Sequence, residues 1–138
     1  MHQRTCLDAS DVRILMAAGR AEAERRGLPV AFAIVDEAGV LLALERLDGA
    51  RLHTPEAAWL KARTAAITRT STEDLQAAIQ TNAALLAFPR RLPLTGGLPL
   101  LVGEEIVGGV GSSGGEPEDD LAVCHAVCAA LRRLPVAG

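Results

Sequence analysis

The spacing of apolar positions along the chain predicts four helices. Small apolar residues recur at helical intervals in each of them, and capping residues, prolines or acidic side chains stand at their starts. Glycine, proline or arginine stands at the ends. The predicted helices run from Asp8 or Ser10 to Gly27, from Thr54 to about Arg69, from Ser71 to about Phe88, and from Pro117 to Arg133.

Between the helices, two pairs of apolar runs predict two β-hairpins. The expected strands cover residues 30–36, 40–46, 98–102 and 106–111, with turns at Gly39 and Gly103. The resulting order, α–β–β–α–α–β–β–α, is typical of an antiparallel sheet with helices packed on it. We therefore expect one α+β domain over residues 1–138.

Three glycines fall inside the strand predicted at 106–111. Glycine weakens a strand interior, and it commonly marks a bend or a site where another backbone approaches closely. The strand is therefore a candidate for close packing against a neighbouring segment.

The composition argues against several classes of function. The net charge is −3 and aromatic residues make up 2% of the chain, which argues against nucleic-acid binding. Apolar runs are too short to span a membrane. Residues 1–12 hold no apolar signal segment, and three cysteines are too few for a disulfide framework, so we expect a cytoplasmic protein.

Two polar positions stand out in the first half of the chain. Arg46, at a strand end, could clamp a carboxylate, and Asp48 in the following turn could act as a base or a ligand. The structural alternative is a turn in which the two residues pair with each other. Lys61, the only lysine, could bind an anion or form a Schiff base, or could be an ordinary surface charge.

Glycine-rich segments occur at Gly96-Gly97 and at residues 108–115. The second leads from a strand towards a helix start, but it lacks the lysine of a P-loop, and Asp119 and Asp120 would repel phosphate. A backbone nest for a small carboxylate fits it better. The structural alternative is a turn followed by a helix cap.

Cys124 and Cys128 share one helix face, whereas His125 points about 100° away. We expect the two thiols to be packing residues and predict no metal site. His53, in the loop after Asp48, is better placed to move a proton or to bind a haem iron, although an exposed loop histidine is the simpler reading.

Six motifs in order resemble the GlcG/HbpS-like family of haem-binding or haem-degrading proteins, which includes the C-terminal domain of PduO-type proteins. They are Ala33-Ile-Val-Asp36, Glu45-Arg46-x-Asp48-Gly49-Ala50, Lys61-Ala62-x-Thr64-Ala65, Gly96-Gly97-x-Pro99, Gly108-x-Val110-Gly111-x-Ser113-Gly114-Gly115 and Pro117-Glu-x-Asp120. They cover about residues 8 to 133.

The resemblance implies a profilin-like α/β/α sandwich with an antiparallel sheet. It also implies dimer-based oligomers, octamers among them, and binding of haem or another small molecule. Carried over residue by residue, it marks nine site residues: Arg46, Asp48, Lys61, Thr64, Gly96, Gly97, Ser113, Gly114 and Asp120.

Two functions remain open. One is a small-molecule-binding protein with haem as a possible cofactor. The other is a small enzyme acting on a carboxylated metabolite, with Arg46 or Lys61 holding the carboxylate and Asp48, Asp120 or His53 moving a proton. In either case we expect the pocket where the 46–53 loop, the helix bearing Lys61 and the two glycine-rich segments meet.

Overall fold

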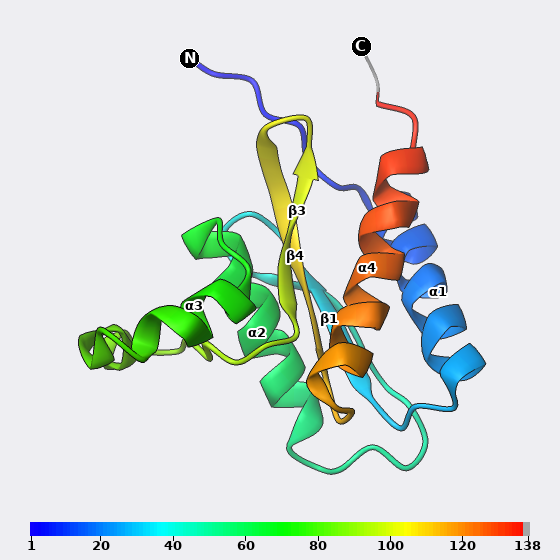
Figure 1. Cartoon of the computed structure of the whole chain (residues 1–138). Helices are drawn as coiled ribbons and strands as arrows, with labels where there is room; N and C mark the ends of the chain where they lie inside the picture. The colour runs from blue at the N-terminus through cyan, green and yellow to red at the C-terminus, as the bar shows by residue number, and fades with distance from the viewer. Residues whose placement is uncertain (137–138) are drawn as a thin grey trace.

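A computed structural model describes residues 1–136 of the chain. They form an α+β domain, as predicted (Figure 1). The elements are α1 (Ala9–Arg26), β1 (Ala31–Val35), β2 (Leu41–Arg46), α2 (Thr54–Thr68), α3 (Thr72–Ile79), the 3-10 helix η1 (Ala83–Ala87), β3 (Gly97–Val102), β4 (Glu105–Ser113) and α4 (Pro117–Arg133).

The strands form one antiparallel sheet in the order β2-β1-β4-β3. The two predicted hairpins therefore lie side by side, and β1 pairs with β4 where they meet. Ala31 of β1 lies opposite Ser113 of β4. The end of β4 and the start of β1 therefore share one end of the sheet, the lower end in Figure 1.

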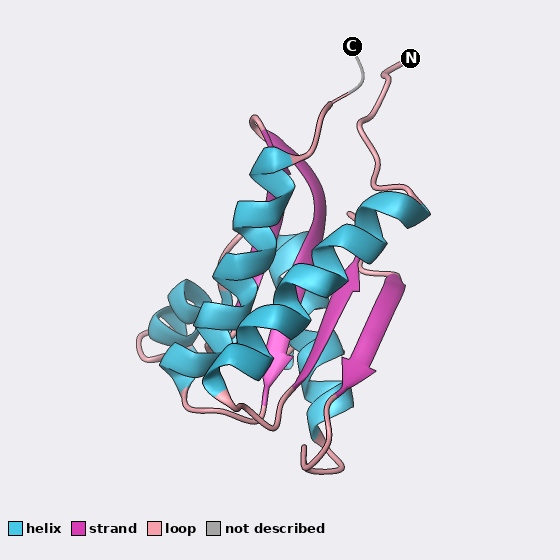
Figure 2. Cartoon of the chain, turned by 90° about the vertical axis from the view of Figure 1, so that its right-hand side faces the viewer, coloured by secondary structure: helices cyan, strands magenta, loops and turns pink. Residues whose placement is uncertain are grey.

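Helices cover both faces of the sheet. Figure 1 shows α2 and α3 on one side and α1 with α4 on the other, and Figure 2 views the molecule from the side of α1 and α4. The main core lies under α1 and α4, where Leu15, Ile34, Leu100 and Val127 are fully buried. Small side chains, among them Ala33 and Ala58, fill the other layer.

The glycines of β4 allow the backbone of α2 to rest directly on the sheet. A Cβ placed on Gly111 would come within 2.2 Å of the Ala58 carbonyl oxygen, and one on Gly109 within 2.3 Å of the Ala62 carbonyl oxygen. This confirms the prediction of close backbone approach, and it fixes the position of α2 and hence of Lys61.

Most element bounds agree with the prediction, but the third helix is shorter. It ends at Ile79 instead of near Phe88. Asn82 has φ −145° and ψ 81°, outside the helical region, and a 3-10 turn follows it. Threonine and asparagine hydrogen-bond locally to the backbone and are poor interior helix residues, which explains the break.

At the first helix the structure decides between the two candidate caps. The Asp8 carboxylate accepts the Asp11 backbone N–H at 2.8 Å, while Asp11 in turn accepts the Asp8 N–H at 3.0 Å. Within residues 1–136, no helix is long and apolar enough to cross a membrane.

Candidate functional site

Lys61 lies at the centre of a buried polar cluster. It projects from α2 at the end of the sheet and is only 5% exposed. Its Nζ donates to the Ser112 carbonyl oxygen at 3.0 Å and lies 3.5 Å from Oδ2 of Asp120. Because a lone buried cation is costly, these two oxygens explain how the amine is kept inside the protein.

Asp120 joins the cluster from the first turn of α4 and is 3% exposed. Its Oδ1 accepts the Gly115 backbone N–H at 3.1 Å and the Ser112 hydroxyl at 3.5 Å. Burial raises the pKa of the Asp120 carboxyl, and the Lys61 ammonium opposes the rise. Within the glycine-rich segment 108–115, where we expected a backbone nest for a small carboxylate, the Gly115 N–H thus binds the chain's own carboxylate.

Gly96 and Gly97 wall the cluster on the side of β3. Gly96 has φ +123°, and a Cβ there would come within 2.7 Å of the Ser112 carbonyl oxygen and 3.0 Å of Lys61 Nζ. The Gly97 N–H donates to Thr72 Oγ1 at 2.8 Å. Glycine at position 96 therefore leaves space beside the amine.

Thr64 has a structural contact outside this cluster. Its hydroxyl donates to the Leu60 carbonyl oxygen at 2.6 Å and accepts the Leu92 N–H at 2.8 Å. It thereby ties the loop before β3 to α2. Leu92 in turn lies close in sequence to Leu94 and Thr95, which reach the pocket described next.

The cluster forms the floor of a pocket of about 710 Å³. The 49–53 loop, α2, the 94–95 segment and the β4–α4 connection surround it. We expected the 46–53 loop and Gly96-Gly97 at the pocket, but residues 46–48 and the two glycines do not line it. Its polar lining residues are Arg51, His53, Lys61, Gln76, Thr95, Ser113, Glu116, Asp119 and Asp120, and Leu28, Pro29, Gly49, Leu94, Gly114, Gly115 and Pro117 complete it.

Arg46 and Asp48 lie elsewhere. They line a separate hollow of about 470 Å³ against α1. Glu45 beside them is held by Arg20, whose Nε donates to Oε1 at 2.7 Å. Leu28 and Pro29 line both hollows and separate them. The structure therefore brings together Lys61, Asp120, His53, Ser113 and Gly114, with Gly96 beside the amine, and leaves Arg46 and Asp48 apart.

The cysteines of α4 are packed as expected. Cys124 is fully buried, and its thiol lies 3.3 Å from the Gly96 carbonyl oxygen. Burial raises the pKa of both the Cys124 and the Cys128 thiols. His125 points away to an exposed hollow between α1 and α4. The described residues contain no group of three or more side chains placed to hold a metal ion.

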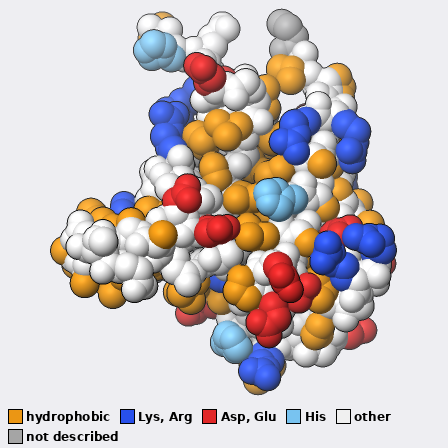
Figure 3. Space-filling view, in the orientation of Figure 1, with side chains coloured by type: hydrophobic (Ala, Val, Ile, Leu, Met, Phe, Trp, Pro, Cys, Tyr) orange, Lys and Arg blue, Asp and Glu red, His pale blue; other side chains and the backbone are white. Residues whose placement is uncertain are grey.

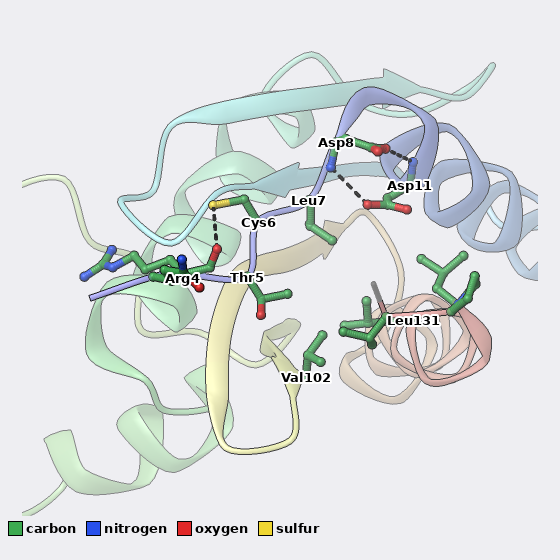
Figure 4. Close-up of a pocket in the computed structure, with 12 residues that line it drawn as sticks. Arg4, Thr5, Cys6, Leu7, Asp8, Asp11, Val102 and Leu131 are labelled. Carbon is green, nitrogen blue, oxygen red and sulfur yellow. Dashed lines mark hydrogen bonds between the residues drawn. The ribbon is translucent and has the colours of Figure 1, made fainter. Parts of the chain in front are cut away.

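Another hollow, of about 590 Å³, lies between the N-terminal segment and the end of α4 (Figure 4). Cys6, Leu7, Val102 and Leu131 are among its lining residues. The Cys6 thiol points to the Arg4 carbonyl oxygen at 3.9 Å. None of the predicted site residues lines it.

Several residues of the cluster and the pocket were not predicted from the sequence. Ser112 supplies the carbonyl oxygen nearest the lysine, and Arg51, Gln76 and Thr95 line the walls. Ser112 adjoins the motif residue Ser113, so its proximity was visible in the sequence. Its role depends on the register of β4, which the sequence does not show. Gln76 reaches the pocket because its side chain accepts the Thr95 N–H at 2.8 Å.

The fold and the site together define a class: a small α/β/α domain with a polar pocket at one end of its antiparallel sheet. The family model described as "Haem degrading protein HbpS-like" matches residues 7–129, and the chain belongs to this HbpS-like family.

Comparisons with curated proteins and with solved structures support the same family assignment. Protein GlcG of Escherichia coli K12 is 34% identical over 117 residues, covering 82% of this chain and 85% of GlcG. A double mutant of HbpS from Streptomyces reticuli superimposes with a TM-score of 0.89 at 30% identity, covering 95% of this chain and 90% of that one. PduOC in complex with haem superimposes with a TM-score of 0.85 at 28% identity, covering 96% and 98%.

Proposed function

We propose that this protein binds a small molecule in the pocket above Lys61 and Asp120. The observation that carries the proposal is the convergence of buried, oppositely charged side chains on the floor of an open pocket. Polar groups convergent in a concave site are the usual mark of a ligand site. The membership of the HbpS-like family supports the same conclusion.

Haem is the ligand to test first, because a related structure is a haem complex. Polar and apolar residues that suit haem line the pocket. His53 lines the pocket and its side chain makes no capping hydrogen bond to α2, so its imidazole would be the residue to bind the haem iron. Arg51 can hold a propionate, and Leu28 and Leu94 offer apolar surface. Bound haem would supply an iron centre for ligand or redox chemistry.

A haemin titration followed by visible absorption tests this proposal. We expect a saturable shift of the Soret band for the unaltered protein. His53→Ala should abolish the shift or reduce the affinity at least tenfold. His125→Ala is the matched control, because His125 is also exposed but lies in another hollow. A titration that does not saturate would contradict haem as the ligand.

Arg46→Ala separates the two neighbouring hollows. If the ligand occupies the pocket above Lys61, this variant keeps the affinity of the unaltered protein, whereas Arg51→Ala weakens it. Loss of affinity in Arg46→Ala with a normal melting temperature would instead extend the site into the hollow beside α1.

We further propose that the protein works as a homo-oligomer built from dimers. The edge strand β2 exposes Leu41, Leu42 and Leu44, and the arm formed by α3 and η1 exposes Leu86 and is edged by apolar side chains in Figure 3. Exposed apolar patches on a sheet edge favour association. Light scattering should give a multiple of 14.4 kDa, reduced in Leu44→Glu but not in Ile14→Glu on α1. A monomer mass in the unaltered protein would contradict this.

We propose that the protein is located in the cytoplasm. All three cysteines, Cys6, Cys124 and Cys128, carry free thiols, as is usual in a reducing compartment. Cell fractionation followed by immunodetection would test it, and recovery outside the cytoplasmic fraction would contradict it.

A further inference from the structure

We infer that Lys61 is a nucleophile that captures a reactive carbonyl group of the ligand as an imine. The inference rests on the proposed function, since it requires that the pocket admit a small molecule. It specifies the chemical class of that molecule, a small aldehyde, and the protein atom with which the aldehyde reacts, Nζ of Lys61.

The amine is held at the surface of the pocket. Lys61 is 5% exposed yet lines the cavity, so its accessible surface faces this space. Its two protein partners are the Ser112 carbonyl oxygen and Asp120, which leaves one position on the nitrogen for a ligand. Gly96 also spares the amine a close contact, because a Cβ at this position would stand 3.0 Å from Nζ.

Asp120 can take the proton that an attacking amine must lose. Transfer of one proton from the ammonium to the carboxylate leaves two neutral groups, so burial makes this transfer less costly than it is in water. Burial already raises the pKa of the Asp120 carboxyl. Its Oδ2 lies 3.5 Å from Nζ, close enough for transfer after a small side-chain movement.

The reaction then balances within the pocket. The nitrogen lone pair forms a C–N bond to the carbonyl carbon, the carbonyl π bond breaks, and the proton held by Asp120 passes to the oxygen. The resulting carbinolamine loses the second nitrogen proton and its hydroxyl group as water, which leaves a C=N bond to Lys61. No oxidant, reductant or metal takes part.

The chain makes the test unusually direct, because it contains one lysine. The other primary amine is the α-amino group of Met1, which serves as an internal reference in the same molecule. In solution an α-amino group, with a pKa of about 8, reacts with aldehydes faster than a lysine with a pKa of about 10.4. Preference for a nearly buried lysine would therefore be a property of the pocket.

The experiment treats the full-length protein with butanal and sodium cyanoborohydride at pH 7 and maps the reduced adduct by peptide mass spectrometry. Succinic semialdehyde, in which a carboxylate replaces the methyl group, is the second probe. We expect the Lys61 adduct to exceed the Met1 adduct about tenfold, against the solution order of the two amines. If succinic semialdehyde is trapped faster than butanal, the ligand class is an aldehyde that also carries a carboxylate. If the two rates are equal, the aldehyde group alone defines the class.

Two variants separate capture from a structural role. Lys61→Arg keeps a cation beside Asp120 but cannot form the imine, so its adduct should be confined to Met1. Asp120→Asn keeps a hydrogen-bonding side chain but cannot take the proton, so it should slow trapping at Lys61 at least tenfold. The comparison within the unaltered protein stands even if either variant fails to fold.

The outcomes distinguish this inference from the proposed function. Adducts on Met1 alone, in a preparation that binds haemin saturably, overturn the imine and leave ligand binding intact. A Lys61 adduct in a preparation that does not bind haemin supports the imine and contradicts haem as the ligand. Faster labelling of Met1 after unfolding in guanidinium chloride, with Lys61 preferred only in the folded protein, supports the pocket as the cause.

Discussion

Lys61 Nζ on α2 lies 3.5 Å from Asp120 Oδ2 on α4, so a buried ion pair connects two helices that cover opposite faces of the sheet. Both side chains contact Ser112, close to the end of β4 at Ser113. Asp120 is 59 positions further along the chain. The pair therefore connects α2 and α4 across the sheet and also forms the floor of the pocket.

Lys61→Met should lower the free energy of unfolding by about 3 kcal/mol or more, because it leaves the buried Asp120 carboxylate without its cation. The double variant Lys61→Met/Asp120→Asn should be less destabilised, since it removes the unpaired charge. Urea unfolding at pH 7 measures both. Arg25→Met, which breaks the exposed contact with Glu22, is the control and should lower the free energy of unfolding much less, because water screens an exposed ion pair. Equal losses of unfolding free energy in Lys61→Met and Arg25→Met would show that the buried pair stabilises the fold no more than the exposed pair.

Gly111→Ala tests the docking of α2 on β4. The new methyl group would meet the Ala58 carbonyl oxygen at 2.2 Å, and neither backbone can move without disturbing the sheet. We expect a loss of about 3 kcal/mol or more, the upper part of the range for overpacked cores. Gly103→Asn is the control, because Gly103 has φ +63° and no neighbour within 4 Å. A melting temperature for Gly111→Ala close to that of the control would contradict the packing.

The acid side of the stability profile should depend on Glu22. Hydrogen bonds from Arg25 and Arg26 lower the pKa of its carboxyl from 4.5 to about 2. A lowered pKa in the folded state stabilises the protein above pH 4.5, and this stabilisation is lost as the pH falls towards 2. Glu22→Gln should therefore be less stable than the unaltered protein at pH 7, by up to about 1 kcal/mol for a partly exposed pair.

The difference between Glu22→Gln and the unaltered protein should shrink between pH 4.5 and pH 2, as measured by urea unfolding at several pH values. Glu24→Gln, on the exposed side of the same helix, provides the control for removing a charge. A difference that stays constant down to pH 2 would mean that the two arginine contacts do not stabilise the folded state.

The cysteines should differ in reactivity towards Ellman's reagent. Cys6 is exposed and should react at once. Cys124 is fully buried, and burial raises its thiol pKa, so it should react only on unfolding. Cys6→Ser identifies the fast phase. Rapid reaction of Cys124 in the native protein would show that α4 opens readily from the sheet.

Local signals in the sequence were enough for most of the fold. Asp8 caps α1 through a contact three residues away, and Pro55 and Pro117 stand in the first turns of α2 and α4. The two hairpins depend on short turns between apolar runs. Because each of these features rests on neighbours in the chain, it can be read without the tertiary structure. The end of the third helix was missed, because the alanines and leucines at 83–87 continue the apolar pattern beyond the break at Thr81 and Asn82.

Lys61, Asp120, His53 and Ser113 were visible in the sequence as candidates, but their grouping was not. Arg46 and His53 lie seven positions apart, yet they face different hollows, and the segment Leu28-Pro29 lines both. Lys61 and Asp120 meet only because the sheet orders its strands β2-β1-β4-β3 and glycines bring α2 close to β4. The sequence by itself determined the helices, the hairpins and the candidate polar side chains. The tertiary structure decided which of these side chains share a pocket, because that depends on strand register and helix packing between distant segments.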